Sequence, residues 1–160
     1  MSRSSPAALR RHIARLGLSP HPEGGWYREI WRAEDRVDSS LGSRPAATCI
    51  LFLLGGGAIS RLHRLAQDEI WCHHDGPGLD LHVFDPGDGR HQVHALGRSV
   101  LGPAVVPAGA WMGAEAPAGW GLVSCVCAPG FDFSDLLFAQ EDDMKRWFED
   151  HTLTLRRLMA

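Results

Sequence analysis

The stretch that decides the fold is Gly57-Ala-Ile-Ser-Arg-Leu-His63-Arg-Leu65-Ala-Gln-Asp-Glu69-Ile-Trp71-Cys-His73-His74-Asp-Gly76. Residues 58–65 and 69–74 are short runs rich in β-forming residues, so we expect two successive strands. Because side chains alternate along a strand, positions 61, 63 and 65 share one face, and positions 69, 71 and 73 share a face of the next strand. If His63 points inward, its imidazole lies near the carboxylate of Glu69.

Short runs of β-forming residues also occur before and after this stretch. Gly, Pro and Asp clusters separate further runs at residues 26–31, 47–54, 79–84, 91–96, 104–106, 111–115 and 121–128. Short strands at a spacing of about ten residues are typical of a sandwich or barrel. We therefore expect a single, mainly β domain over residues 1–160, with a barrel over 24–138 and short helices over 1–17 and 141–159.

Composition excludes several classes of function. The chain has 160 residues, 44% of them hydrophobic, which suits one compact domain. A net charge of −3 gives no basic field for nucleic acid, and the longest apolar stretch, residues 46–54, is too short to span a bilayer. Four cysteines without a C-x-x-C pair suggest small core residues in a reducing compartment. We expect a cytoplasmic protein that binds neither nucleic acid nor membrane.

The deciding stretch resembles the first motif of the cupin superfamily, in which His-x-His is followed by Glu and then Gly. His63, Glu69 and Gly76 occupy their places, but Leu65 stands at the second histidine. The segment Pro107-Ala-Gly109-Ala-Trp111-Met112 is similar to the second motif, with Met112 at its histidine. The resemblance implies a cupin jelly-roll β-barrel.

Four segments narrow the resemblance to one cupin group. They are Pro22-Glu-Gly-Gly-Trp-Tyr-Arg-Glu29, His63-Arg-Leu-Ala-Gln-Asp-Glu-Ile-Trp71, Val106-Pro-Ala-Gly-Ala-Trp111 and Ala128-Pro-Gly-Phe-Asp-Phe133. They are similar to the small, single-domain cupins described as predicted sugar epimerases. This resemblance implies a homodimer and an analogy to the epimerases of nucleotide-linked keto-sugars.

The missing ligands favour chemistry without a metal. A catalytic metal needs at least three protein ligands, and Leu65 and Met112 stand where two would be. If a divalent metal is bound, the remaining set is His63, Glu69 and His73. A metal-dependent oxygenase or lyase is then the alternative function, and a non-catalytic cupin that binds a small ligand is a further one.

Acid–base chemistry requires fewer groups. His63, oriented by Glu69, can remove an acidic proton next to a carbonyl, and a second group then returns a proton. The resemblance to keto-sugar epimerases implies a tyrosine acid, and Tyr27 is the single tyrosine; His73 is the alternative acid. We therefore expect an isomerase, epimerase or cyclase that acts on a small carbonyl metabolite, in sugar or secondary-metabolite biosynthesis.

The expected substrate-binding residues surround this pair. Arg61 is the arginine predicted to face inward, where it could bind a carboxylate or phosphate. Trp71 and Trp111 could form an aromatic floor for a ring, although core packing is the other interpretation for each. The remaining candidates are Glu29, His82 and Met112.

Overall fold

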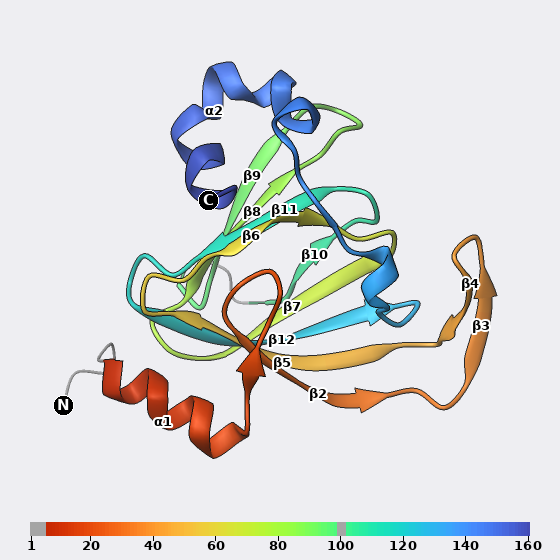
Figure 1. Ribbon diagram of the computed structural model, residues 1–160, viewed down its shortest axis with the longest axis vertical. Coiled ribbons are helices and arrows are strands. Elements are labelled where there is room, and N and C mark those ends of the chain that lie inside the picture. Colours follow the sequence, from red (N-terminus) through yellow and green to blue (C-terminus); the bar gives the residue numbers. More distant parts are fainter. Residues whose placement is uncertain (1–5, 99–101) are drawn as a thin grey trace.

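The computed structural model describes residues 6–98 and 102–160, and within them the chain forms two antiparallel sheets that face each other (Figure 1). The first sheet has the strand order β1-β2-β5-β12-β7-β10 and the second the order β13-β6-β11-β8-β9. The first is built from β1 (Ser19–Pro20), β2 (Trp26–Arg32), β5 (Thr48–Gly55), β12 (Trp120–Ala128), β7 (Asp68–Asp75) and β10 (Ala104–Val106). The second is built from β13 (Leu137–Phe138), β6 (Ser60–Arg64), β11 (Trp111–Glu115), β8 (Leu79–Phe84) and β9 (His91–Leu96).

A separate hairpin extends from the end of β2. Strands β3 (Arg36–Ser39) and β4 (Gly42–Pro45) pair with each other, and the hairpin projects from the first sheet as an arm (Figure 1). Most of its side chains are exposed. The chain returns from this arm directly into β5, which pairs with β2 along its length.

The main core lies between the two sheets because alternate residues of facing strands are apolar. Phe52 of β5 and Val123 of β12 meet Leu81 of β8 and Met112 of β11 in one buried cluster. Large buried side chains of this kind supply most of the favourable free energy of folding. This cluster holds the two sheets at a fixed separation, so that a cavity between them has rigid walls.

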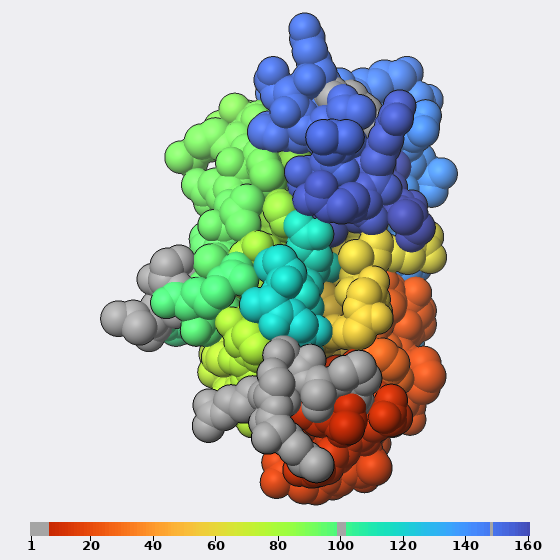
Figure 2. Space-filling model, turned by 90° about the vertical axis from the view of Figure 1, so that its left-hand side faces the viewer, coloured from red at the N-terminus to blue at the C-terminus, as the bar shows by residue number. Residues whose placement is uncertain are grey.

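Each terminal helix covers the outer face of one sheet. Helix α1 (Pro6–Leu16) packs Leu9 against Leu53 and Trp120 of the six-stranded sheet. Helix α2 (Lys145–Leu158), preceded by the 3-10 turn η2 (Glu141–Met144), covers the five-stranded sheet at the opposite end of the molecule (Figure 2). Non-helical backbone angles at His151 interrupt α2 with a kink.

The expected mainly β jelly roll with a short helix at each end is confirmed. Hydrogen bonding between the strands forms two sheets, however, and does not close them into one barrel. Residues 1–5 of the predicted N-terminal helix lie outside the described residues. Within the described ranges, every helix is too short or too polar to cross a membrane.

Candidate active site

A cavity of about 290 Å³ lies at one end of the space between the sheets. Strands β2, β5, β7 and β12 form its walls, and the segments before β2 and after β12 complete it. Its polar lining residues are His21, Glu23, Tyr27, Glu29, Arg32, Thr48 and Glu69. The other lining residues are Ile50, Leu65, Cys125, Cys127, Phe131 and Phe133.

Glu23 and His63 form a buried hydrogen-bonded pair at the inner end of the cavity. The Nδ1 atom of His63 lies 2.6 Å from the carbonyl oxygen of Arg61, so Nδ1 donates there and holds the proton of the neutral ring. Nε2 of His63 carries no proton in this tautomer, lies 3.1 Å from Oε2 of Glu23 and accepts a hydrogen bond from the protonated carboxyl group. Ser60 donates to the other oxygen of Glu23, at 2.9 Å. The pair thus holds one proton between its two side chains.

Burial sets the protonation of this pair. It raises the pKa of Glu23 to about 8, although the hydrogen bond from Ser60 opposes the shift. Burial also lowers the pKa of His63, against the hydrogen bond to the Arg61 carbonyl. The raised pKa of Glu23 and the lowered pKa of His63 both favour a protonated carboxyl group beside a neutral imidazole at neutral pH.

A turn rich in glycine carries Glu23 into the site. Gly24 and Gly25 both have positive φ, at 111° and 71°, which L side chains rarely adopt. A side chain at Gly24 would also collide with the carbonyl oxygen of Ile59. The close approach lets the Arg61 amide donate to the Glu23 carbonyl oxygen at 2.7 Å, which fixes the turn against β6.

Glu69 is the second buried carboxyl group in the cavity. Trp71 donates its indole N–H to Oε2 of Glu69 at 2.9 Å, and the Cys127 thiol lies 3.8 Å from Oε1. Burial is the main reason that the pKa of Glu69 rises to about 7, and repulsion from Glu23 adds to it. Glu69 is therefore partly ionised at neutral pH, whereas Glu23 keeps its proton.

His21 and Tyr27 stand together on the wall formed by the start of β2. Their rings meet edge to face with centroids 4.5 Å apart. Burial lowers the pKa of His21 to about 4, so its imidazole is neutral above that pH. The edge-to-face contact with His21 holds the Tyr27 ring in the lining of the cavity that Glu23 and Glu69 also line.

An ion pair marks the open side of the cavity. Arg32 donates through Nε and a terminal nitrogen to both oxygens of Glu29, at 2.9 and 2.7 Å, and both side chains are partly exposed. The same guanidinium also donates to the carbonyl oxygen of Phe131 at 3.4 Å. The pair therefore ties β2 to the segment after β12.

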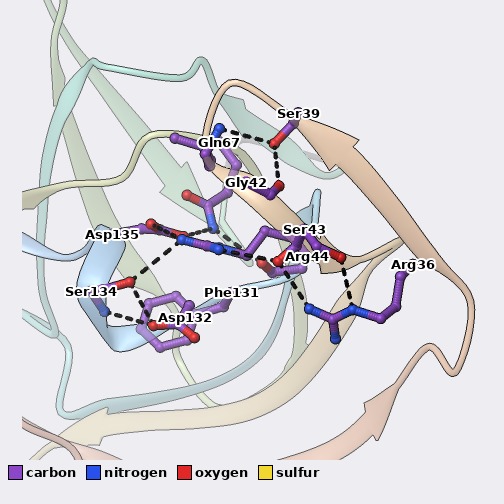
Figure 3. A network of polar contacts seen from close by, with 12 residues as sticks. Arg36, Ser39, Gly42, Ser43, Arg44, Gln67, Phe131, Asp132, Ser134 and Asp135 are labelled. Atoms are coloured by element: carbon purple, nitrogen blue, oxygen red, sulfur yellow. Dashed lines mark hydrogen bonds and ion pairs between the residues drawn. The ribbon is translucent and has the colours of Figure 1, made fainter.

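The hairpin β3–β4 braces that segment from outside. Arg44 donates to both oxygens of Asp135, at 3.0 and 2.8 Å, and the amide nitrogen of Gln67 donates to Oδ2 of the same carboxylate at 3.4 Å (Figure 3). Asp132 accepts from Ser134 and caps the 3-10 turn η1 (Phe133–Asp135). These contacts hold the turn that carries Phe131 and Phe133, which line the cavity.

The structure brings some of the sequence-predicted residues to this cavity. Tyr27, Glu29 and Glu69 line it directly. His63 lies behind Glu23 and Trp71 behind Glu69, each joined to its carboxyl group by a hydrogen bond.

The structure places the other predicted residues elsewhere. His73 is four residues from Glu69 on the same strand, which is about 13 Å at the usual rise per residue. The two side chains therefore cannot coordinate the same metal ion. Arg61 was expected to face inward, but it is exposed and its guanidinium lies over the Phe138 ring, 4.5 Å from the centroid. Met112 is buried in the core beside His63.

His82 and Trp111 lie on the outer face of the five-stranded sheet. His82 contacts His91 at 3.1 Å and Glu115 at 3.3 Å. Trp111 packs in the cluster that α2 covers. Neither residue reaches the cavity, because both belong to the opposite face of their strands.

Sequence reasoning missed His21, Glu23 and Arg32. Glu23 and its two glycines were present in the segment Pro22 to Glu29, and a turn with two successive glycines was the signal that its carboxyl group could reach inward. Arg32 is three residues beyond Glu29, and a β-bulge between Glu29 and Trp31 brings the ion pair together.

The residues do not fit a metal centre of the cupin type. Two of its ligand positions are the apolar side chains of Leu65 and Met112, which both belong to the core cluster. Both nitrogen atoms of His63 are engaged, one with a carbonyl oxygen and one with Glu23. Among the residues that the structure describes, no group of three or more His, Cys, Asp or Glu side chains is arranged to hold a metal ion.

Comparison with known proteins agrees with this architecture. Residues 10–139 match the family described as Cupin superfamily (DUF985). A hypothetical protein from Leishmania major is 35% identical with a TM-score of 0.83, and the match covers 93% of this chain and 97% of that one. A protein from Shewanella oneidensis is 31% identical with a TM-score of 0.83, covering 94% and 96% of the two chains.

More distant structures share the fold alone. Oxalate decarboxylase from Bacillus subtilis is 18% identical, with a TM-score of 0.57 over 87% of this chain and 36% of that chain. None of the curated proteins matches the sequence.

Proposed function

Because this chain belongs to the cupin superfamily, in the family DUF985, we propose that it is an acid–base enzyme that isomerises or epimerises a small carbonyl compound in the cavity between its sheets. One observation carries the proposal. Glu23 and Glu69 are both buried, both line one cavity, and have pKa values of about 8 and about 7. A protonated acid and a partly ionised base in one site are what proton transfer at neutral pH requires.

Each carboxyl group has its own step. The Glu69 carboxylate removes the proton from the carbon next to the carbonyl, and the Glu23–His63 pair supplies its proton to the carbonyl oxygen, which gives an enol. Isomerisation requires a hydroxyl group on the carbon that lost its proton: Glu69 returns its proton to the former carbonyl carbon, while that hydroxyl group gives a proton back to the Glu23–His63 pair and becomes the new carbonyl group. Epimerisation instead returns the enol proton to the Glu23–His63 pair and adds a proton from the Tyr27 hydroxyl to the opposite face of the same carbon. Glu69 and Tyr27 then regain their starting states by proton exchange with solvent.

His63 has an indirect role in this proposal. It is buried behind Glu23 and does not line the cavity, so we assign it as a positioning residue that holds the shared proton. This replaces the expectation that His63 is itself the base. Glu69 takes the role of base because it lines the cavity.

Exchange of substrate hydrogen with solvent tests the proposal without knowledge of the product. The protein is incubated in D₂O with small aldoses, ketoses, amino ketones and 2-keto acids, and loss of the signal from hydrogen next to the carbonyl is followed by ¹H NMR. We expect one compound class to exchange, and Glu69→Gln to slow that exchange by about 100-fold or more.

The control is Glu115→Gln, which removes a carboxylate that lies outside the cavity beside Arg157. It should exchange at the wild-type rate. Exchange at an undiminished rate in Glu69→Gln, or no exchange with any compound, would contradict the proposal.

We also propose that the protein is a homodimer that pairs through the outer face of the six-stranded sheet. Strand register places Trp31, Cys49, Val126, Ile70 and Val105 side by side across five strands, on the face away from the cavity. Trp31 and Val105, at the ends of this row, are 53% and 54% exposed. Val105→Glu should convert the dimer to a monomer in sedimentation velocity, and a monomeric wild type would contradict the proposal.

A further inference from the structure

Acidic side chains outnumber permanent cations in the lining of the cavity. Glu23, Glu29 and Glu69 line it, and among its described lining residues the guanidinium of Arg32 is the single permanent cation. Both oxygens of Glu29 already accept hydrogen bonds from Arg32. The two terminal nitrogens of the same guanidinium also donate to the carbonyl oxygen of Phe131. Arg32 is therefore neutralised and has little donor capacity left for a ligand.

Among the described residues, none of the lysine, arginine or histidine side chains forms an ion pair with Glu69, and the nearby His63 imidazole is neutral. Its hydrogen-bond donors are the Trp71 indole and the weak Cys127 thiol, both neutral. A carboxylate can accept about four hydrogen bonds, so acceptor capacity remains on the side that faces the cavity. Burying an ionised carboxylate without a cation costs free energy because the charge loses its hydration. The same loss of hydration is the main cause of the raised pKa of Glu69.

Aromatic rings form another part of the lining. Tyr27 stands beside His21, and Phe131 packs edge to face against Phe133 with centroids 5.0 Å apart. The faces of such rings attract cations through their quadrupole. A carboxylate and aromatic rings around one small space are together selective for a positively charged group.

We propose that the substrate carries a protonated amino group, which binds Glu69 within the aromatic lining, and that the cavity rejects carboxylates and phosphates. The inference rests on the proposed function only in treating this cavity as the substrate site. The volume of 290 Å³ equals about ten water molecules, so the ligand is small. An amino ketone or a single amino sugar fits both the size and the acid–base chemistry.

Three probes that differ in charge and little in shape test this inference. They are 3,3-dimethylbutylamine, 3,3-dimethylbutan-1-ol and 3,3-dimethylbutanoate, titrated against the full chain at about pH 8 by calorimetry or ligand-observed NMR, where the amine is protonated. We expect the Kd of the amine to be at least about tenfold below that of the alcohol, because an ammonium–carboxylate hydrogen bond is charge-assisted. The carboxylate should bind more weakly than the alcohol.

Substitutions in the cavity test whether Glu69 and the aromatic rings are the source of the preference for the amine. In Glu69→Gln the amide oxygen still accepts from Trp71, so the alcohol should keep its Kd while the advantage of the amine disappears. Phe133→Leu, at a half-exposed position where folding is not at risk, should weaken the amine about threefold and leave the alcohol unchanged. Glu115→Gln, outside the cavity, should keep the wild-type order.

Each other outcome overturns the inference. Equal binding of amine and alcohol, tightest binding of the carboxylate, no binding of the amine, or an amine preference that survives in both cavity variants would each do so. These results concern binding alone, so they are separate from the hydrogen-exchange test. Loss of exchange without loss of the amine preference would contradict the proposed reaction and leave this inference standing.

Discussion

Glu23→Gln is the change that most directly tests the description of the site. The protonated carboxyl group of Glu23 donates to His63 and accepts from Ser60. A glutamine amide can do both, because its NH₂ donates and its oxygen accepts. The substitution therefore keeps the hydrogen bonds and removes the titration.

The expected effect follows from proton linkage. In the unfolded chain Glu23 ionises near its ordinary pKa of 4.5, but in the folded protein it ionises at about 8. Between these values the folded state holds one more proton than the unfolded state, so stability falls as pH rises, by up to about 1.4 kcal/mol per pH unit. From about pH 6.5 to 8, the wild type should lose about 1.5 kcal/mol relative to Glu23→Gln, since ionisation of the folded state begins near the upper limit.

Urea denaturation followed by tryptophan fluorescence measures this difference at several pH values across the window. Taking wild type minus variant cancels the contribution of His21, which titrates in both proteins. Glu69 does not cancel in the same way, because repulsion from Glu23 raises its pKa, so the pair of proteins is also compared in a Glu69→Gln background. Glu115→Gln is the matched control, because hydrogen bonds from Arg157 lower the pKa of Glu115 and keep it ionised throughout the window. Parallel pH profiles for wild type and Glu23→Gln, or a wild type that gains stability relative to the variant, would refute the assignment.

Three further predictions concern the framework of the site. Gly24→Ala should cost about 2 kcal/mol more in urea denaturation than Gly57→Ala, since both have positive φ but only at Gly24 does the added carbon meet backbone; equal losses would count against this. A double-mutant cycle of Arg44→Ala and Asp135→Ala should show that the two losses of stability are not additive, because the bidentate ion pair is removed by either change, and additive losses would show that the ion pair does not brace the turn. Arg61→Ala should leave hydrogen exchange unchanged, because its side chain is exposed; a large loss would return Arg61 to the site.

The sheets could be predicted because their pattern is local. Strands β8, β9, β10 and β11 begin and end at the residues expected from alternation and from the Gly and Pro clusters between them. The hairpin β3–β4 could not be found in this way, because it projects from the sheet and its residues are mostly exposed, so burial leaves little periodic signal.

The site was predicted in part for a related reason. Alternation correctly indicates that Glu69, Trp71 and His73 share a strand face, but not how far along that face the cavity extends. His73 therefore lies beyond it, and its Nε2 atom is buried without a hydrogen-bond partner. Glu23 was missed because its position depends on a non-repetitive turn and on β6, which lies far away in the sequence.

The walls of the cavity come from segments around residues 21–32, 48–50, 65–69 and 125–133. Bringing such distant parts of a chain together is the slow step in folding β proteins, because loop closure precedes the contacts that reward it. A chain that has not yet paired β12 with both β5 and β7 lacks one wall and cannot hold a ligand. Ligand capture thus reports the end of folding, and a small molecule that fits the cavity would act as a chaperone for this protein during its synthesis.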